Sequence, residues 1–206
     1  MKIGFFMGSF DPIHIGHINI IREALYKASL DKVIVVPSGH NPWKKDIEPA
    51  PFALRVAMIE AAIKPFGDKV EVSDIESTFE PPYYSNKPLN YFKEKYKDDE
   101  LYVICGSDTA EKIPFWKSAE EDIIPHYTIL AFDREEDKYE KGTTINYAKG
   151  PSEKYYPYTH FHIEPFPVSS TLIRIMVKEK ECLYPLLPEE VIRIIEKNNL
   201  YKNEKD

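Results

Sequence analysis

The chain of 206 residues has little cysteine and no long hydrophobic run. Its two cysteines, Cys105 and Cys182, cannot build the multi-bridge framework of a small secreted domain. No apolar run approaches the roughly 18 residues that a membrane helix needs, and no signal peptide is visible at the first residues. We therefore expect a soluble, cytoplasmic protein of a reducing compartment, with no membrane partner.

An excess of positive charge is also missing. The sequence has 27 Lys and Arg against 34 Asp and Glu, which gives a formal net charge of −7. Nucleic-acid binding depends on clustered Lys and Arg, so we expect no nucleic-acid partner. A small anionic ligand needs only a few local cations and fits this charge. The sequence contains neither the GxGxxG fingerprint of dinucleotide-binding domains nor the GxxxxGK[ST] motif of P-loop proteins.

Strand and helix signals alternate along the chain, which predicts an α/β fold with right-handed crossovers. The expected strands are Lys2–Met7, Lys32–Val36, Lys69–Ser73, Leu101–Cys105, Tyr127–Phe132 and a short last one at Phe161–Ile163. The expected helices begin after His17 and cover Phe52–Ile63, Pro88–Tyr96, a stretch from Ser169–Thr171 to about Lys178, and Pro188–Asn198.

This pattern predicts a Rossmann-like, doubly wound, mostly parallel sheet with a small C-terminal helical segment at about 169–201. No linker or internal repeat divides the chain, so we expect a single domain over residues 1–206. Asp133–Tyr158 is charged and weakly patterned, and we expect it to be a mobile excursion from the sheet.

The residues Gly8–His17, with the sequence GSFDPIHIGH, join the first expected strand to the first helix. Such a junction directs free backbone N–H groups and the positive end of a helix dipole at one point, which suits a phosphate. His14 and His17 share a helix face and could neutralise phosphoryl oxygens. The plainer alternative is a turn with two surface or capping histidines. Because no third residue has metal-ligand spacing, we assign no metal ligands.

A second anion site is suggested by Val168–Arg174, with the sequence VSSTLIR. Ser169, Ser170 and Thr171 offer hydroxyl and N–H donors at the start of a helix. Arg174 lies over the same face and could bind oxygens bidentately. An ordinary helix cap with an exposed arginine remains the alternative for this segment taken alone.

Both motifs resemble those of the nicotinate/nicotinamide mononucleotide adenylyltransferase family, within the (H/T)xGH nucleotidyltransferases. Gly8–His17 resembles the signature GG[ST]FDPxHxGH, with Met7 at the first glycine, and Val168–Arg174 resembles ISSTxIR, with Val168 for Ile. The two occur in the family's order. The resemblance implies that both bind the phosphates of ATP and that the histidines stabilise the transferring group.

Other segments resemble the family's mononucleotide site. Pro37–Lys44 is similar to the P-x-x-x-PPHK loop, with Trp43 at the histidine, and Pro82–Ser85 is similar to the SYT segment. Gly106–Asp108 matches GxD, and Trp116 stands where a tryptophan stacks on the pyridine ring, although a partly buried core aromatic is the alternative. Arg134 resembles the arginine of the RPG turn, and Cys182–Tyr201 resembles the packing helix LLPxxVxxYIxxxxLY.

The resemblance therefore implies three sets of site residues. The implied catalytic residues are His14, His17, Lys44 and Arg174. The implied ATP-binding residues are Gly8, Ser9, Phe10, His14, Gly16, His17, Gly106, Asp108, Ser169, Ser170, Thr171 and Arg174. The implied mononucleotide-binding residues are Ser9, Phe10, Lys44, Tyr84, Ser85, Trp116, Lys117 and Arg134.

The implied reaction joins ATP and nicotinate mononucleotide to give nicotinate adenine dinucleotide (deamido-NAD) and pyrophosphate, in NAD biosynthesis, with Mg²⁺ accompanying ATP.

Three alternatives stay open. Nicotinamide mononucleotide could be the main substrate. Pantetheine-phosphate adenylyltransferases share the GSFDPxTxGH start, but they would not account for Trp116 or Cys182–Tyr201. A nucleotide-sensing module without turnover is the third, and the intact His14, His17 and Arg174 argue against it. Self-association into a homo-oligomer also stays open.

Overall fold

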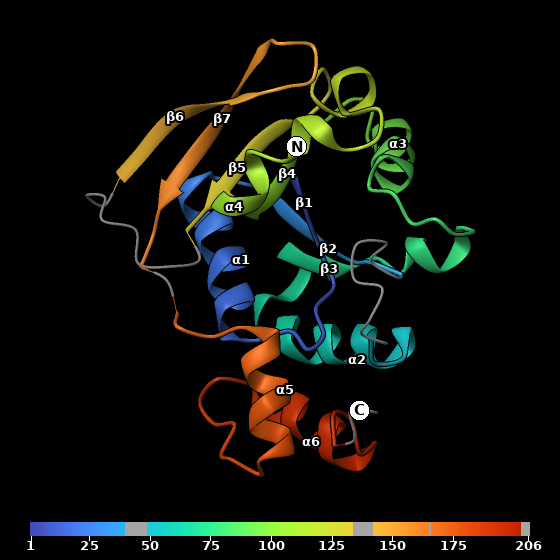
Figure 1. Cartoon of the computed structure of the whole chain (residues 1–206), viewed down its shortest axis with the longest axis vertical. Coiled ribbons are helices and arrows are strands. Elements are labelled where there is room, and N and C mark those ends of the chain that lie inside the picture. The colour runs from blue at the N-terminus through green and yellow to red at the C-terminus, as the bar shows by residue number, and fades with distance from the viewer. Residues whose placement is uncertain (40–48, 134–141, 165, 203–206) are drawn as a thin grey trace.

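A computed structural model describes residues 1–39, 49–133, 142–164 and 166–202. These residues form one seven-stranded sheet in the order β3-β2-β1-β4-β5-β7-β6, with helices on both faces (Figure 1). Every pairing is parallel except the one between β6 and β7. The strands are β1 (Lys2–Gly8), β2 (Lys32–Pro37), β3 (Val70–Val72), β4 (Glu100–Gly106), β5 (Thr128–Phe132), β6 (Gly142–Lys149) and β7 (Tyr155–His162).

Continuous apolar runs form the central strands because both faces of a parallel sheet are covered. Successive residues of β1 point to opposite faces: Phe6 joins one buried cluster and Phe5 joins the other. In register, Phe5 stands opposite Ile34 of β2 and Val103 of β4. The mostly parallel, doubly wound sheet expected from the sequence is confirmed.

The helices divide between the two faces. They are α1 (Ile15–Lys27), α2 (Phe52–Ile63), α3 (Asn86–Lys95), α4 (Ser107–Ala110), α5 (Ser170–Lys178) and α6 (Glu189–Lys197). Residues of α1, α2, α5 and α6 share the cluster that contains Phe6, whereas α3 and α4 contribute to the cluster around Phe5. No helix in the described part of the chain has both the length and the apolar composition needed to span a membrane.

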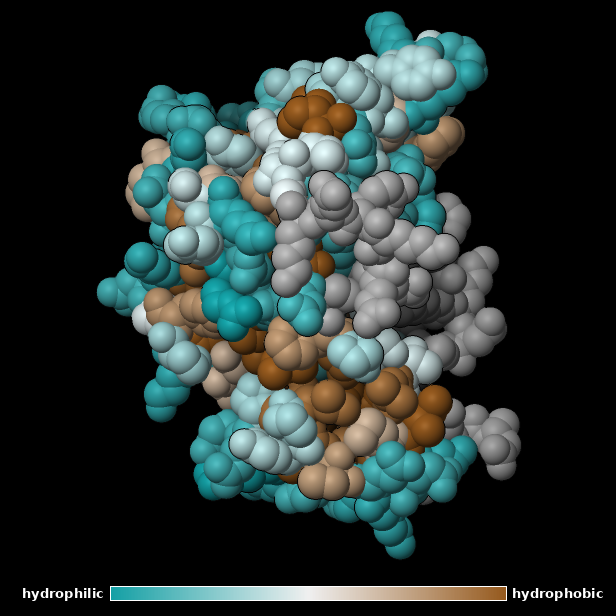
Figure 2. Space-filling model, turned by 90° about the vertical axis from the view of Figure 1, so that its left-hand side faces the viewer, coloured by the Kyte–Doolittle hydropathy of each residue, from teal (hydrophilic) through white to brown (hydrophobic). Residues whose placement is uncertain are grey.

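The helical segment formed by α5 and α6 lies below α1 and α2 in Figure 1. Ile173 of α5 and Val191 and Ile195 of α6 are buried in the same cluster as the core residues of α2. Figure 2 shows hydrophobic side chains gathered in the lower half of one face, at the height of α5 in Figure 1. The exposed residues of α5 include Leu172 and Ile175.

The expectation for Asp133–Tyr158 is wrong over residues 142–158, because these residues form most of an antiparallel hairpin. Gly142 pairs with His162 and Lys149 with Tyr155. The expected short strand at Phe161–Ile163 is the end of the much longer β7. β6 is an edge strand whose residues are mostly exposed, so it lacks the apolar alternation on which the sequence prediction relied. Residues 134–141 lie outside the described part of the chain.

Candidate active site

A cleft opens at the carboxyl edge of the sheet, beside the loops that follow β1 and β4. The strand order reverses between these two neighbours, since β2 and β3 lie on one side and β5 lies on the other. Open α/β sheets bind their ligands at such a reversal. The cleft has a volume of about 1770 Å³, and its lining includes the first loop, α4 and the start of α5.

His14 and His17 form a close pair at the start of α1, with ring centroids 3.8 Å apart. His14 is extended and precedes the helix, and its backbone N–H donates to Nδ1 of His17 over 3.3 Å. A neutral His17 therefore carries its proton on Nε2, which makes that nitrogen a hydrogen-bond donor. The ring of Phe10 packs against His17 with centroids 5.0 Å apart and fixes its orientation. The pair suits anionic oxygens.

Phe10 has a packing role that the motif does not reveal. Its side chain is buried and its backbone is in the left-handed region, with φ of 46°. A Cβ atom on Gly8 would lie 3.2 Å from the Phe10 ring, so the missing side chain at Gly8 allows the loop to fold back on itself. The close approach at Gly8 therefore lets the Phe10 ring pack into the buried cluster of Phe6.

The second motif lies directly against the first. The hydroxyl of Ser170 donates to the carbonyl oxygen of Pro12 over 2.9 Å, and Nη1 of Arg174 donates to that of Asp11 over 2.8 Å. Ser169 caps α5 by accepting the N–H of Leu172 over 3.1 Å. A Cβ atom on Gly16 would lie 3.3 Å from Val168, so glycine allows the two segments to approach. Two motifs far apart in sequence thus share one wall.

Arg55 and Asp11 are buried charged residues that hold the first loop in place, and Arg55 makes the larger number of contacts. Arg55 of α2 is 1% exposed and donates to the carbonyl oxygens of Ser9, Gly39 and Ala50 over 2.7, 3.0 and 3.0 Å. It thereby ties the loop after β1 to the loop after β2. Burial lowers the pKa of Arg55. The three carbonyl oxygens that accept its hydrogen bonds offset the cost of burying the guanidinium. Sequence reasoning missed Arg55, although a lone basic residue in FALRVAMIEAAI is a usable signal.

The carboxylate of Asp11 connects the first loop to two other segments of the chain. Its Oδ1 accepts the N–H of Ala50 over 3.1 Å and the hydroxyl of Tyr201 over 2.7 Å. Burial, with the nearby Asp11 carboxylate, raises the pKa of Tyr201 and keeps its hydroxyl a donor. The Asp11 carboxylate therefore binds the segment before α2 and the segment after α6.

The lining of the cleft also contains the residues expected around a pyridine ring. Nζ of Lys117 lies 4.9 Å from the centre of the Tyr84 ring, a cation–π contact. Trp116 is half-buried and packs partly against the core cluster of Phe5. Tyr84, Ser85, Trp116 and Lys117 all line the cleft. The tryptophan is thus both a packing residue and a wall of the cleft.

The structure brings most of the expected site residues to one cleft. Those that line it are Gly8, Ser9, Phe10, His14, Gly16, His17, Asp108, Ser169, Ser170, Thr171, Tyr84, Ser85, Trp116 and Lys117. Two others lie beside it: Gly106 is buried at the end of β4, and Arg174 contacts the first loop from behind Thr171. Lys44 and Arg134 lie outside the described residues.

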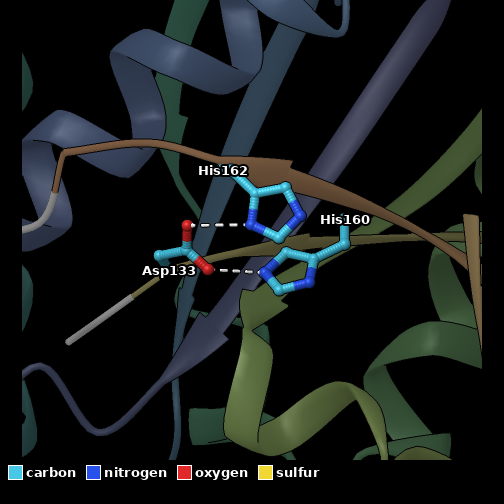
Figure 3. A group of neighbouring side chains, drawn as sticks. All are labelled: Asp133, His160 and His162. Atoms are coloured by element: carbon cyan, nitrogen blue, oxygen red, sulfur yellow. Dashed lines mark hydrogen bonds and ion pairs between the residues drawn. The ribbon is translucent and has the colours of Figure 1, made fainter. Parts of the chain in front are cut away.

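Three cleft residues were not expected from the sequence. Asp133, at the end of β5, faces His160 and His162, which lie on one face of β7 (Figure 3). His160 Nε2 lies 2.6 Å from Oδ1 of Asp133, and His162 Nδ1 lies 3.4 Å from Oδ2. Two histidines two positions apart in a strand share a face, which was the signal available in the sequence.

Comparisons with known proteins identify the family of this chain. The family model described as cytidylyltransferase-like matches residues 5–176. The chain is similar to a probable nicotinate-nucleotide adenylyltransferase of Clostridium novyi (strain NT), with 36% identity over 202 residues that cover 98% of this chain and 99% of the relative. A probable nicotinate-nucleotide adenylyltransferase of Flavobacterium johnsoniae is 33% identical over 205 residues, covering 98% and 100%.

A solved structure shares the fold. Plasmodium falciparum nicotinic acid mononucleotide adenylyltransferase, complexed with NaAD, superposes with a TM-score of 0.76. The match covers 100% of this chain and 99% of that one at 20% identity. The same α/β architecture therefore occurs in a protein whose amino-acid sequence has diverged widely.

Proposed function

This chain belongs to the cytidylyltransferase-like family, as one of its nicotinate-nucleotide adenylyltransferases, and we propose that its cleft joins ATP to nicotinate mononucleotide. The products are nicotinate adenine dinucleotide and pyrophosphate. One observation carries the assignment of the site: Ser170 and Arg174 bond to the loop of His14 and His17, so both phosphate motifs surround one space.

In the proposed reaction, an oxygen of the 5′-phosphate of the mononucleotide attacks the α-phosphorus of ATP. A new phosphorus–oxygen bond forms as the bond from the α-phosphorus to the bridging oxygen of the β-phosphate breaks, and pyrophosphate leaves with the electron pair. The catalytic task is to position two anions and to stabilise the charge on the phosphorus oxygens.

Residues at the start of α1 and at the start of α5 supply this stabilisation. His17 offers Nε2–H, and His14 lies beside it at the positive end of α1. The start of α5 offers the N–H and hydroxyl groups of Ser170 and Thr171, and Arg174 adds a permanent positive charge. A divalent ion enters as part of the substrate, and we propose the complex of ATP with Mg²⁺, in which the ion neutralises the pyrophosphate oxygens.

The pyridine ring would lie against Trp116 in the cleft, with Tyr84, Ser85 and Lys117 around it. Lys117 beside the Tyr84 ring offers a positive charge, which favours the carboxylate of nicotinate over the neutral amide of nicotinamide. Lys44 and Arg134 complete the proposed set as phosphate and mononucleotide contacts.

We place this activity in the cytoplasm, where ATP is made available and an exposed thiol such as Cys182 remains reduced. Self-association stays a prediction, and light scattering on the purified chain measures it.

The function is tested with the purified full-length chain, ATP and MgCl₂. Nicotinate mononucleotide, nicotinamide mononucleotide and phosphopantetheine are offered separately, and pyrophosphate release is followed with a coupled assay. We expect the highest kcat/KM with nicotinate mononucleotide. Turnover with phosphopantetheine alone would overturn the proposal, and ATP binding without pyrophosphate release on any acceptor would indicate a sensor.

A further inference from the structure

We propose that Asp133, His160 and His162 bind one divalent transition-metal ion, with Zn²⁺ as the expected occupant. This site is separate from the adenylyl-transfer residues and goes beyond the proposed reaction. Among residues 1–39, 49–133, 142–164 and 166–202, these three form the one group of histidine, cysteine and acidic side chains whose ligand atoms gather closely, all within 4.8 Å of one another.

The donor atoms already converge on one point (Figure 3). His160 Nε2 and His162 Nδ1 both turn toward the carboxylate of Asp133, one to each oxygen, at 2.6 and 3.4 Å. Ligand atoms around a tetrahedral zinc ion lie about 2.0–2.1 Å from the metal and hence roughly 3.3–3.5 Å from one another. Small rotations of the three side chains are enough to reach that spacing.

The outer nitrogens of both rings are held by the neighbouring strand. Thr144 Oγ1 lies 3.1 Å from His162 Nε2, and the Asn146 amide lies 3.2 Å from His160 Nδ1. Metal-binding imidazoles commonly donate their second N–H to such a partner, which fixes the tautomer and the ring orientation. The hydroxyl of Thr144 can accept this proton, and the Asn146 amide can do so with its oxygen turned to the ring.

The carboxylate is fixed in the same way. Asp133 Oδ2 accepts the backbone N–H of Ile163 over 3.1 Å, so its orientation is set by the segment that follows β7. Each of the three proposed ligands therefore has a second contact that holds its donor atom toward the common point.

Burial and charge favour a metal ion at this place. Asp133, His160 and His162 are only 5, 5 and 6% exposed. A buried carboxylate is costly unless it has a partner, and a divalent cation bound by Asp133 and the two imidazoles would be such a partner. The set of two nitrogens and one oxygen is typical of Zn²⁺ and of Co²⁺ or Ni²⁺, whereas Mg²⁺ prefers oxygen ligands.

The proposed ion can be reached from the cleft. All three ligands line it, together with Thr144 and Asn146. A water molecule from the cleft would complete a four-coordinate site, as in zinc sites with three protein ligands. His14 and His17 lie at the start of α1, with α5 packed against their loop, whereas the proposed ligands lie on β7 and just after β5, so we expect a mutation in one group to leave the other unchanged.

The test uses untagged full-length protein stripped with a chelator and titrated with Co²⁺, then with Zn²⁺ in competition. We expect one ion per chain, visible absorption bands of four-coordinate Co²⁺, and their loss when Zn²⁺ is added. At a hundredfold excess of Zn²⁺ over Kd, Tm should rise by roughly 5–10 °C. These readouts do not depend on adenylyl transfer, so a failure here leaves the proposed function standing.

Variants locate the site. Asp133→Asn and His162→Gln should each weaken Co²⁺ binding by at least tenfold, and Thr144→Val, which keeps all three ligands, by about tenfold. The controls are His126→Gln, an exposed histidine, and His17→Gln, which should both bind Co²⁺ like the wild type. Circular dichroism checks the fold of every variant. A folded wild type that binds no Co²⁺ or Zn²⁺, or binding lost in His17→Gln but kept in His162→Gln, would overturn the proposal.

Discussion

Arg174 donates a 2.8 Å hydrogen bond from Nη1 to the carbonyl oxygen of Asp11, across 163 positions of the sequence. Its Nη2 donates to Thr171 Oγ1 over 3.3 Å, whereas its Nε is buried without a hydrogen-bond partner among the described residues. The guanidinium is thus held at the junction of Gly8–His17 and Val168–Arg174, with two of its five N–H donors engaged in these hydrogen bonds.

Replacing Arg174 by Lys keeps the charge but removes the planar donor fork. We expect kcat/KM for ATP to fall by about a hundredfold, because the lost contacts act on the phosphates during transfer. Steady-state kinetics with varied ATP measure the effect. Arg193→Ala on the exposed surface of α6 is the matched control and should behave like the wild type. Unchanged ATP kinetics in Arg174→Lys would remove this residue from the site.

His17→Ala should lower kcat by roughly 100- to 1000-fold while the protein stays folded, since the Nε2–H donor serves the reacting phosphates. Pyrophosphate release measures the rate, and thermal unfolding checks the fold. His126→Ala, at an exposed position, is the control. Near wild-type turnover in His17→Ala would contradict the assignment, and so would its failure to fold.

Trp116→Ala should mainly raise KM for the mononucleotide, because the ring lines the cleft where we propose that the pyridine ring stacks. We expect about a tenfold rise or more, in line with the loss of one aromatic stacking contact. Initial rates at saturating ATP give this value, with Tyr26→Ala, 82% exposed on α1, as the control. An effect confined to KM for ATP would show that Trp116 does not hold the pyridine ring.

Arg55→Met should lower the free energy of unfolding by about 3 kcal/mol or more, because three buried carbonyl groups lose a charged donor. The loops after β1 and β2 would also lose their common anchor, so KM for both substrates should rise. Urea unfolding and kinetics measure the two effects. Arg22→Met, at an exposed arginine of α1, is the control. A loss below about 1 kcal/mol would mean that water replaces the guanidinium.

Glu76 gives a prediction about pH. Burial raises the pKa of this carboxyl above its ordinary value, against the opposing effects of the Gly39 N–H, Arg55 and Lys87. A raised pKa in the folded state contributes stability that is present below the unfolded pKa and is lost as pH rises through the folded pKa. Glu76→Gln keeps an oxygen for the 2.7 Å bond from Gly39 but does not titrate.

We therefore expect the wild type to lose stability relative to Glu76→Gln between pH 4 and pH 7. Urea unfolding of both proteins at the two pH values isolates the difference, because all other titrating groups are shared. If the wild type instead becomes more stable relative to Glu76→Gln as pH rises, the pKa of Glu76 is not raised by burial.

The sequence predicted the parallel core well because its strands are buried on both faces and read as unbroken apolar runs. Phe52–Ile63 was located to the residue as α2. The hairpin of β6 and β7 was not predicted because β6 is an exposed edge strand and Pro157, which has no N–H to donate, lies within β7. Its stability comes from pairing between strands, and a single segment does not reveal such pairing.

The candidate site was predicted in part for a similar reason. Motifs that are contiguous in sequence, such as Gly8–His17, can be seen before the fold is known. Arg55 and the pair His160 and His162 leave only a weak signal in the sequence, because the significance of these residues depends on which backbone or side-chain groups the fold brings to them. Each is an ordinary residue until the loops or strands around it are placed.

The hydrogen bond from Tyr201 to Asp11 makes the first loop depend on a residue that is synthesised after all seven strands of the sheet. During translation, the strands from β1 to β5 can pair while the phosphate loop still lacks this partner and α5. The nascent chain would thus acquire its sheet first and its nucleotide affinity only once residue 201 has emerged from the ribosome. Ribosome-bound chains of increasing length should show that order.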